Sequence, residues 1–470
     1  MSDCDPLQKT SLEKLLQQGP LSEDQALTIY EQGKEAVVFA LLKLSAELQK
    51  PDIPSPSTPS GMIPPYKKPE GKKRGKKPGR KKGHKGAHRK PPLTIHKHKK
   101  HTMEICPYCN TRLTAEPSEY RKRIIEDIPG HIEPVVTEHT IPRTYCPTCE
   151  KIVEPPVDEA LPKANIGNHL AALTAWLHYG LGTTISQIIA VLSSHLHVRL
   201  TKGGLVNIWH RLAHIFDPWY EQLAGEIQDS AVLHIDETGW RVKGKTYWLW
   251  CFATKRATFY LIDKCRGSPV LQEFFAQEFA GVLITDFWGA YNRLNAALRQ
   301  VCLVHLFREL KKVQQYKDCS EDWPAFSKKL KRLMKDALRL EKRSDIGAKK
   351  FESLKNRLYL RLDNIIQRQW KNTNVRRLIK RLRRHRNDMF TFLDYEDVPS
   401  DNNHAEREIR PAVIMRKNIY ANRSTKGAHT QAVLMSVYRT LKLRNHDLTK
   451  TIAASIATYI RTGTLPPLPE

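Results

Sequence analysis

The sequence has few cysteines for its length, and its least charged stretch contains no long apolar run. Nine Cys in 470 residues are too few for a disulfide-rich secreted scaffold. Between Ala164 and Val198 there is no Asp, Glu, Lys or Arg, yet the longest unbroken apolar run there is Ile188–Leu192. Because a membrane-spanning helix needs about 20 predominantly apolar residues, we expect buried helices of a soluble domain there and no membrane partner.

Acidic residues are also scarce relative to basic ones. The chain has 49 Asp and Glu against 77 Lys and Arg, which gives a formal net charge of +28. A charge of this sign and size favours a polyanionic partner, most often nucleic acid. The hydrophobic content of 40% excludes a fully disordered chain. The first residues lack the basic and apolar regions of a secretory signal, so we expect a cytoplasmic protein.

Residues 1–50 predict a helical segment. Apolar residues recur at helical spacing between Lys34 and Leu48, as they do on one face of an amphipathic helix. A self-associating helix and a simple docking helix both fit this short stretch.

Residues 51–103 predict a Pro/Ser-rich linker followed by a basic segment. Between Lys67 and Lys100 there are sixteen Lys and Arg and one acid. Such a segment is expected to be disordered in isolation and to bind DNA without sequence preference, although a solvated tail or a localisation signal has the same composition. The candidate DNA contacts in it are Arg80, Lys81, Lys82 and Lys85.

Two Cys-Pro-x-Cys pairs, separated by 36 residues, predict a structural zinc site. The four ligands would be Cys106, Cys109, Cys146 and Cys149. Each pair can place two thiolates on one side of a tetrahedral ion, and two pairs close a Cys₄ site with no open position. Apolar and polar residues alternate between the pairs, so we expect a zinc ribbon over residues 104–152. A redox CxxC would need one pair beside a βαβ unit and does not explain two.

Residues 160–229 predict a helical domain. Thr184 and Thr201 are each followed by apolar residues at helical spacing, so each is expected to cap a helix. Two such helices fit a DNA-binding helix-turn-helix, and they fit equally well two core helices of a larger domain. In the first interpretation Lys202, His210 and Arg211 face the DNA.

From Ala231 onward the pattern changes to strands. Residues 231–236, 246–253 and 258–263 are rich in β-branched and aromatic residues and predict a three-stranded antiparallel meander. A helix over 268–278, a buried parallel strand over 281–286 and a fifth strand over 300–305 follow. This β-β-β-α-β-α-β order is that of a ribonuclease-H-like domain.

The remaining sequence predicts helices. Residues 320–398 are expected to be helical and very basic, with Arg376, Lys380 and Arg384 on one helix face. The core domain would then cover 230–428, and a helical tail 429–470. The expected fold is multidomain α+β: a ribonuclease-H-like α/β core with a helical insertion, preceded by a zinc ribbon and the helical domain.

Three acids are the candidate catalytic residues. Asp236 ends the first strand, Asp286 ends the fourth, and Glu406 lies on a later helix. Close carboxylates repel one another unless cations lie between them, and Mg²⁺ prefers oxygen ligands. Each acid also has a simpler explanation. The two Asp could be strand-end turn residues, and Glu406 could form a capping box with Asn403.

Three motifs carry a resemblance to a known family. They are His234-Ile235-Asp236-Glu237-Thr238, Asp286-Phe287-Trp288-Gly289-Ala290-Tyr291, and Asn402-Asn403-His404-Ala405-Glu406-Arg407 with Arg416-Lys417-Asn418 downstream. Together they resemble the motifs of the insertion-sequence-66-type (IS66) DDE transposases of bacteria, over most of the chain. Trp288 departs from the pattern, because the family more often has Tyr or another aromatic residue there.

The resemblance implies that Asp236, Asp286 and Glu406, rather than Glu408, form a catalytic triad in the core. It also implies that the helical stretch of about 315–398 is an insertion between the fifth strand and the helix that bears Glu406. It implies two Mg²⁺ (or Mn²⁺) ions in the active site, one structural Zn²⁺, and cleavage and strand transfer on double-stranded DNA, both transposon ends and target. It also implies a homo-oligomer on DNA and a nucleoid-associated location, and it leaves a need for accessory proteins open. A stand-alone nuclease and a DNA-binding regulator remain the alternatives.

Further predictions concern residues near the three acids in the sequence. The candidate electrostatic partners of the phosphate are Arg407, Arg410, Arg416 and Lys417, whose simpler explanation is ordinary solvated helix charge. Cys302 and His305 match a C-x-x-H signature of some such transposases. One Cys and one His make only half a zinc site, so we expect His305 to pack or to position DNA.

Overall fold

The computed structural model describes residues 23–49, 92, 94–113, 119–129, 132–316, 319, 322–343 and 345–470. The predicted Pro/Ser linker and the candidate DNA contacts Arg80, Lys81, Lys82 and Lys85 lie outside the described residues. The chain divides into two units, Met1–Gly75 with Arg308–Ser320, and Lys76–Phe307 with Glu321–Glu470.

The first unit contains two N-terminal helices, α2 (Glu23–Glu31) and α3 (Lys34–Gln49), which contact each other. Between them Gly33 has a φ of +95°, a conformation that glycine adopts at little cost. The helix predicted between Lys34 and Leu48 is therefore confirmed as α3.

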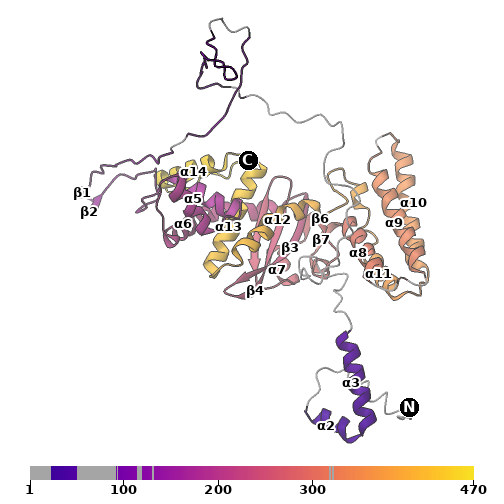
Figure 1. Cartoon of the computed structure of the whole chain (residues 1–470). Coiled ribbons are helices and arrows are strands. Elements are labelled where there is room, and N and C mark those ends of the chain that lie inside the picture. Colours follow the sequence, from indigo (N-terminus) through magenta and orange to yellow (C-terminus); the bar gives the residue numbers. More distant parts are fainter. Residues whose placement is uncertain are drawn as a thin grey trace. The chain divides into compact units, whose positions relative to one another are not determined.

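A five-stranded mixed sheet forms the centre of the second unit (Figure 1). Its strands are β3 (Val232–Val242), β4 (Lys245–Ala253), β5 (Thr258–Asp263), β6 (Phe279–Thr285) and β7 (Ala296–Val301). They lie in the order β5-β4-β3-β6-β7. The first three are antiparallel to one another, whereas β6 runs parallel to both β3 and β7. The predicted meander and the parallel fourth strand are confirmed.

Two predicted elements of the sheet region differ from the structure. The fifth strand was expected over 300–305, but β7 ends at Val301 and helix α8 (Leu303–Tyr316) begins two residues later. The chain turns there because the backbone N–H groups of Cys302 and Leu303 donate to the carbonyls of Thr285 and Ser400. The helix predicted before the fourth strand is α7 (Ser268–Phe274), and a short 3₁₀ helix (Gly289–Arg293) connects β6 to β7 in place of an α-helix.

Helices from both ends of the second unit share one core with the sheet. They are α4 (Asn168–Ala175), a π-helical turn (Trp176–Gly180), α5 (Ile185–His195), α6 (Lys202–Gln228), α13 (Thr425–Leu443) and α14 (Leu448–Thr462). The predicted caps are confirmed: the Thr184 hydroxyl accepts from the N–H of Gln187 at 3.3 Å, and the Thr201 hydroxyl from that of Gly204 at 3.1 Å.

Helix α13 lies against both α6 and the edge strand β5. An edge strand exposes backbone donors that need partners. Here the N–H of Thr258 donates to the Thr440 hydroxyl at 3.0 Å, and the N–H of Tyr260 donates to the Ser436 hydroxyl at 2.9 Å. Helix α13 therefore covers this edge of the sheet with hydrogen bonds as well as apolar contacts.

The predicted helical insertion contains α9 (Trp323–Leu340), α10 (Ala348–Gln367) and α11 (Thr373–Arg384), which pack on one another. After it, α12 (Asn403–Ile419) packs on β3 and β4. No helix in the described part of the chain is both long and apolar enough to cross a membrane.

Candidate active site

The first two candidate acids lie on neighbouring parallel strands, and Asp286 directly follows β6. The expectation that Asp236 ends the first strand is wrong, because β3 stays paired with β4 as far as Val242. In the β3–β6 ladder Val232 pairs with Val282 and His234 with Ile284, an offset of 50 residues. The same offset separates Asp236 from Asp286. Because equivalent positions on paired parallel strands lie side by side on one face, roughly 5 Å apart, the fold brings these two acids to the same edge of the sheet.

The third acid arrives on α12, whose first turn is attached to β3. The Asn402 amide donates from Nδ2 to the Ile235 carbonyl at 2.8 Å, and its Oδ1 accepts from Nδ1 of His234 at 3.0 Å. Asn402 is the N-cap residue of α12, and no side-chain cap hydrogen bond forms there. The capping-box explanation of Glu406 with Asn403 is therefore wrong. Docking on β3 determines where Glu406 lies.

The electrostatics of Asp236 show that the three acids are neighbours. Burial is the main cause that raises the pKa of Asp236 well above its ordinary value, and the charges of Glu237, Asp286 and Glu406 raise it further. A carboxyl group surrounded by other carboxylates is stabilised as an anion only when cations or donors are near. The arrangement is thus a concentration of negative charge contributed by β3, β6 and α12.

Two glutamates on the same helix have different surroundings. The Glu406 side chain is 23% exposed, and its Oε1 lies 3.6 Å from Nε2 of His305. The Glu408 side chain is 5% exposed and forms an ion pair with Arg439, and the Thr258 hydroxyl also donates to it at 3.4 Å. Glu408 is therefore a buried structural acid, whereas Glu406 is partly exposed beside His305.

His305 belongs to this site, although its sequence motif suggested only packing or DNA positioning. Its Nε2 approaches Glu406, while its Nδ1 is buried and has no hydrogen-bond partner among the described residues. Cys302 of the same motif is buried, and its Sγ accepts from the N–H of Asn402 at 3.2 Å. The motif thus connects the start of α8 to the start of α12.

The donor set suits a hard divalent cation, because three carboxylates supply oxygen ligands. Within the residues that the structure describes, no three His, Cys, Asp or Glu side chains converge closely enough to hold an ion. The chemistry of the three acids therefore fits Mg²⁺ or Mn²⁺, but they do not form a closed coordination cage.

Each Cys-Pro-x-Cys pair forms a turn of the same kind. The residue after the second cysteine, Asn110 or Glu150, has a positive φ of 58° or 50°. The Thr111 side chain and the neighbouring Cys106 lower the pKa of Cys109, and backbone hydrogen bonds from Cys149 and Thr148 lower the pKa of Cys146. The second turn is closed by a hairpin of β1 (Thr144–Cys146) and β2 (Lys151–Val153). Each pair is thus a preformed half-site of two thiols, and the described residues do not combine all four.

The candidate DNA-contacting side chains are mostly exposed. On α11 these are Arg376, Lys380 and Arg384; on α12 they are Arg407, Arg410 and Lys417; on α6 the exposed residue is Lys202. Arg416 differs, because its guanidinium donates to the Thr238 hydroxyl at 3.0 Å and to the Gly239 carbonyl. Arg416 therefore fastens α12 to β3 in addition to carrying charge.

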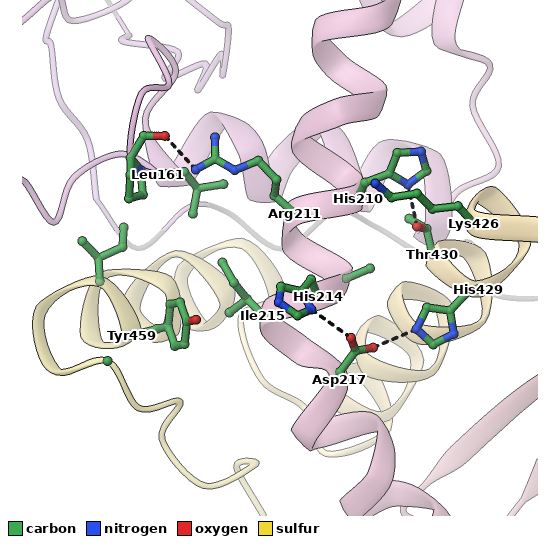
Figure 2. Close-up of a pocket in the computed structure, with 14 residues that line it drawn as sticks. Leu161, His210, Arg211, His214, Ile215, Asp217, Lys426, His429, Thr430 and Tyr459 are labelled. Carbon is green, nitrogen blue, oxygen red and sulfur yellow. Dashed lines mark hydrogen bonds and ion pairs between the residues drawn. The ribbon is translucent and has the colours of Figure 1, made fainter.

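A cavity of about 640 Å³ lies where α6 meets α13 and α14 (Figure 2). His210, which the helix-turn-helix interpretation placed facing DNA, bonds to the Thr430 hydroxyl at 2.7 Å, and Arg211 donates to the Pro162 carbonyl at 2.8 Å. Asp217 lies between two further imidazoles, His429 at 2.9 Å and His214 at 3.4 Å. None of the three candidate acids lines this cavity, so it is separate from the carboxylate site.

Sequence reasoning missed several side chains that surround the acids. Glu237 and Tyr291 lie inside the recognised motifs, so position alone could have suggested them. Arg266 lies in no motif, and only the structure shows that it pairs with Glu237.

Comparison with known proteins gives a consistent result. No curated protein matches this chain. The model of the family described as "Transposase IS66 family" matches residues 163–430, which is more than half of the chain. This range contains the whole sheet, the insertion helices and all three candidate acids. The chain therefore belongs to the IS66 family of transposases.

Proposed function

We propose that this chain binds the ends of an insertion sequence and catalyses metal-dependent DNA cleavage and strand transfer, with Asp236, Asp286 and Glu406 as the catalytic triad. The observation that carries the proposal is geometric: the β3–β6 register brings Asp236 beside Asp286, and Asn402 attaches the helix of Glu406 to β3. In agreement with this, burial, Glu237, Asp286 and Glu406 all raise the pKa of Asp236. Acids from two strands and a helix beyond the insertion would not act on one another unless the fold gathered them. We propose a ribonuclease-H-like core as the fold that does so.

The triad would hold two Mg²⁺ (or Mn²⁺) ions, which when bound supply an activated nucleophile and stabilise the leaving oxygen of phosphodiester attack. Asp236 would supply a ligand oxygen from within β3, and Asp286 would supply one from the residue that follows β6. Glu406 supplies its oxygen from α12, which Asn402 anchors to β3. His305, 3.6 Å from Glu406, orients that carboxylate toward the site.

The exposed basic side chains on α11 and α12 would contact the DNA backbone. Arg376, Lys380 and Arg384 are exposed along one face of α11, where three cations at i, i+4 spacing can follow a phosphate strand. Arg407 directly follows Glu406, Arg410 lies one turn farther along α12, and both are exposed, so they can neutralise charge on a phosphate at the site. Lys202 and the basic segment with Arg80, Lys81, Lys82 and Lys85 complete the proposed DNA contacts.

We propose that Cys106, Cys109, Cys146 and Cys149 hold one structural Zn²⁺. The two thiol pairs have matching turns and lowered pKa values at Cys109 and Cys146, which favours the thiolates that zinc binds. The remaining parts of the proposal are a homo-oligomer on DNA and a cytoplasmic, nucleoid-associated location.

Cleavage of the cognate element ends tests this function. Wild-type protein should cut them only with Mg²⁺ or Mn²⁺, and Asp236→Asn, Asp286→Asn and Glu406→Gln should each abolish cutting while leaving DNA binding intact. Retained cleavage in any variant would overturn the assignment of that residue. A second assay uses pre-cut ends: products joined to target DNA support a transposase, cleavage without joining indicates a nuclease, and binding alone indicates a regulator.

A further inference from the structure

A partly buried ionic and aromatic cluster lies beside Asp236 and Asp286. Its members are Glu237, Trp248, Arg266, Trp288 and Tyr291, which we call the clamp. Glu237 follows Asp236 on β3, and its N–H donates to Oδ1 of Asp236 at 2.9 Å. The Glu237 side chain is 5% exposed. A buried carboxylate needs hydrogen-bond donors or cations to offset its loss of hydration.

Two donors from different segments hold the Glu237 carboxylate. Arg266, between β5 and α7, donates to Oε1 from Nε at 3.2 Å and from Nη2 at 2.9 Å. The Tyr291 hydroxyl, from the 3₁₀ helix after β6, donates to Oε2 at 2.5 Å. Both carboxylate oxygens are therefore occupied by groups of the protein, which leaves Glu237 poorly suited to bind a metal ion itself.

The Arg266 guanidinium is also held between two indole rings. Its central carbon lies 4.4 Å from the Trp248 ring centroid and 4.2 Å from that of Trp288. Arginine stacks on aromatic faces through its planar, delocalised cation, and lysine lacks this geometry. The N–H of Trp288 donates to Oδ1 of Asp286 at 2.8 Å. The Arg266 guanidinium thus links Glu237, which follows Asp236, to Trp288, which lies two residues after Asp286.

This connection lies where backbone pairing has ended. Between β3 and β6, both of which are fully described, the last paired residues are His234 and Ile284. Asp236 and Asp286 lie two residues farther along, so the ladder does not fix their separation there. Side chains must therefore set the separation of Asp236 and Asp286, and the clamp links β3 to the segment after β6 beside these two acids.

We propose that Glu237, Arg266, Trp288 and Tyr291 are positioning residues that set the separation of Asp236 and Asp286 and so the affinity of the site for divalent cations. This inference rests on the proposed function, because it presupposes that these two acids are metal ligands. Groups that orient metal ligands typically change affinity 10–100-fold when removed. The clamp should therefore act on metal binding more than on the rate at saturating metal.

The test measures Mn²⁺ binding to the full-length protein by calorimetry, without DNA. Arg266→Lys keeps the charge and removes the planar stack, and Tyr291→Phe removes only one hydroxyl. Both should weaken Mn²⁺ binding roughly 10-fold. Arg241→Lys is the matched control. Arg241 lies on the same strand as Glu237 but donates to the turn carbonyl of Gly244, so this variant should bind Mn²⁺ as wild type does.

The outcomes separate the clamp from the function on which it rests. If wild-type protein binds Mn²⁺, Asp236→Asn does not, and both clamp variants bind as tightly as wild type, the clamp proposal is refuted while the metal site stands. If Asp236→Asn binds as well as wild type, the proposed function itself fails. High Mn²⁺ should restore cleavage to Arg266→Lys and Tyr291→Phe but not to Asp236→Asn. Should Arg266→Lys not fold, Tyr291→Phe alone decides the question.

Discussion

Glu406 and Glu408 allow a matched comparison, because they lie on the same helix two residues apart. Replacing each by glutamine removes one charge and keeps the shape of the side chain. Glu408 is the buried partner of Arg439, and breaking a buried pair by removing one member costs roughly 3–5 kcal/mol. Since glutamine keeps part of the hydrogen bonding, we expect Glu408→Gln to lower the free energy of unfolding by about 3 kcal/mol.

Glu406→Gln should have the opposite effect on stability. It removes one of the carboxylates that raise the pKa of Asp236, so it relieves repulsion in the folded state. Partial exposure of Glu406 weakens that repulsion, which leaves a gain of at most about 1 kcal/mol. The same substitution should abolish DNA cleavage.

Urea unfolding without divalent metal, followed by tryptophan fluorescence and circular dichroism, measures both changes. Cleavage of element ends with Mg²⁺ measures activity. The reasoning is refuted if Glu408→Gln unfolds at the same urea concentration as wild type, or if Glu406→Gln is the less stable of the two. Either result would mean that the roles of the two glutamates are exchanged.

Three further predictions concern stability. Burial lowers the pKa of His234 to about 4, against an ordinary value of about 6.5. The histidine is neutral in the folded protein, so its contribution to the free energy of unfolding is complete above pH 6.5 and is lost as the pH falls toward 4. The loss should reach about 2 kcal/mol at pH 5. Urea midpoints measured between pH 7 and pH 5 check this, and His234→Gln should flatten the curve. Gly281→Ala should lower the free energy of unfolding by at least about 2 kcal/mol, because the new Cβ would lie 2.4 Å from the Ser230 carbonyl oxygen. Gly225→Ala in α6, where a Cβ would meet nothing within 4 Å, should instead raise it by roughly 0.5–1 kcal/mol. Thermal unfolding distinguishes the two variants. Ser436→Ala leaves the N–H of Tyr260 without its partner and should cost about 1–3 kcal/mol, measured in the same way; an unchanged midpoint would mean that water replaces the hydroxyl.

Much of the sheet could be predicted because its signals are local. Alternating β-branched and aromatic residues mark β3, β4 and β5, and the turn at Lys243 and Gly244, both with positive φ, is a typical hairpin turn. The fifth strand was misplaced because an apolar run such as 301–304 fits a buried strand or the start of a buried helix equally well. Only the contact with the Ser400 carbonyl decides between the two.

The site could be predicted in part. The motifs proposed the three acids, whose catalytic role stays a prediction, and the structure shows that Glu408 is buried against Arg439 whereas Glu406 is partly exposed near His305. Arg266 could not be found, because its importance comes from Trp248, Trp288 and Glu237 around it and not from any sequence pattern. The zinc site and the DNA contacts stay predictions, since they involve ligands or surfaces that act only when a partner is bound.

Helix α13 has a consequence for how the protein becomes competent during its synthesis. A ribosome that has completed β3 through α12 has made all three candidate acids, yet the edge of β5 still lacks Ser436 and Thr440 and α6 still lacks its neighbour. Contacts between segments this distant in sequence form late and slowly. The edge of β5 and the adjoining face of α6 therefore stay uncovered until α13 has been translated.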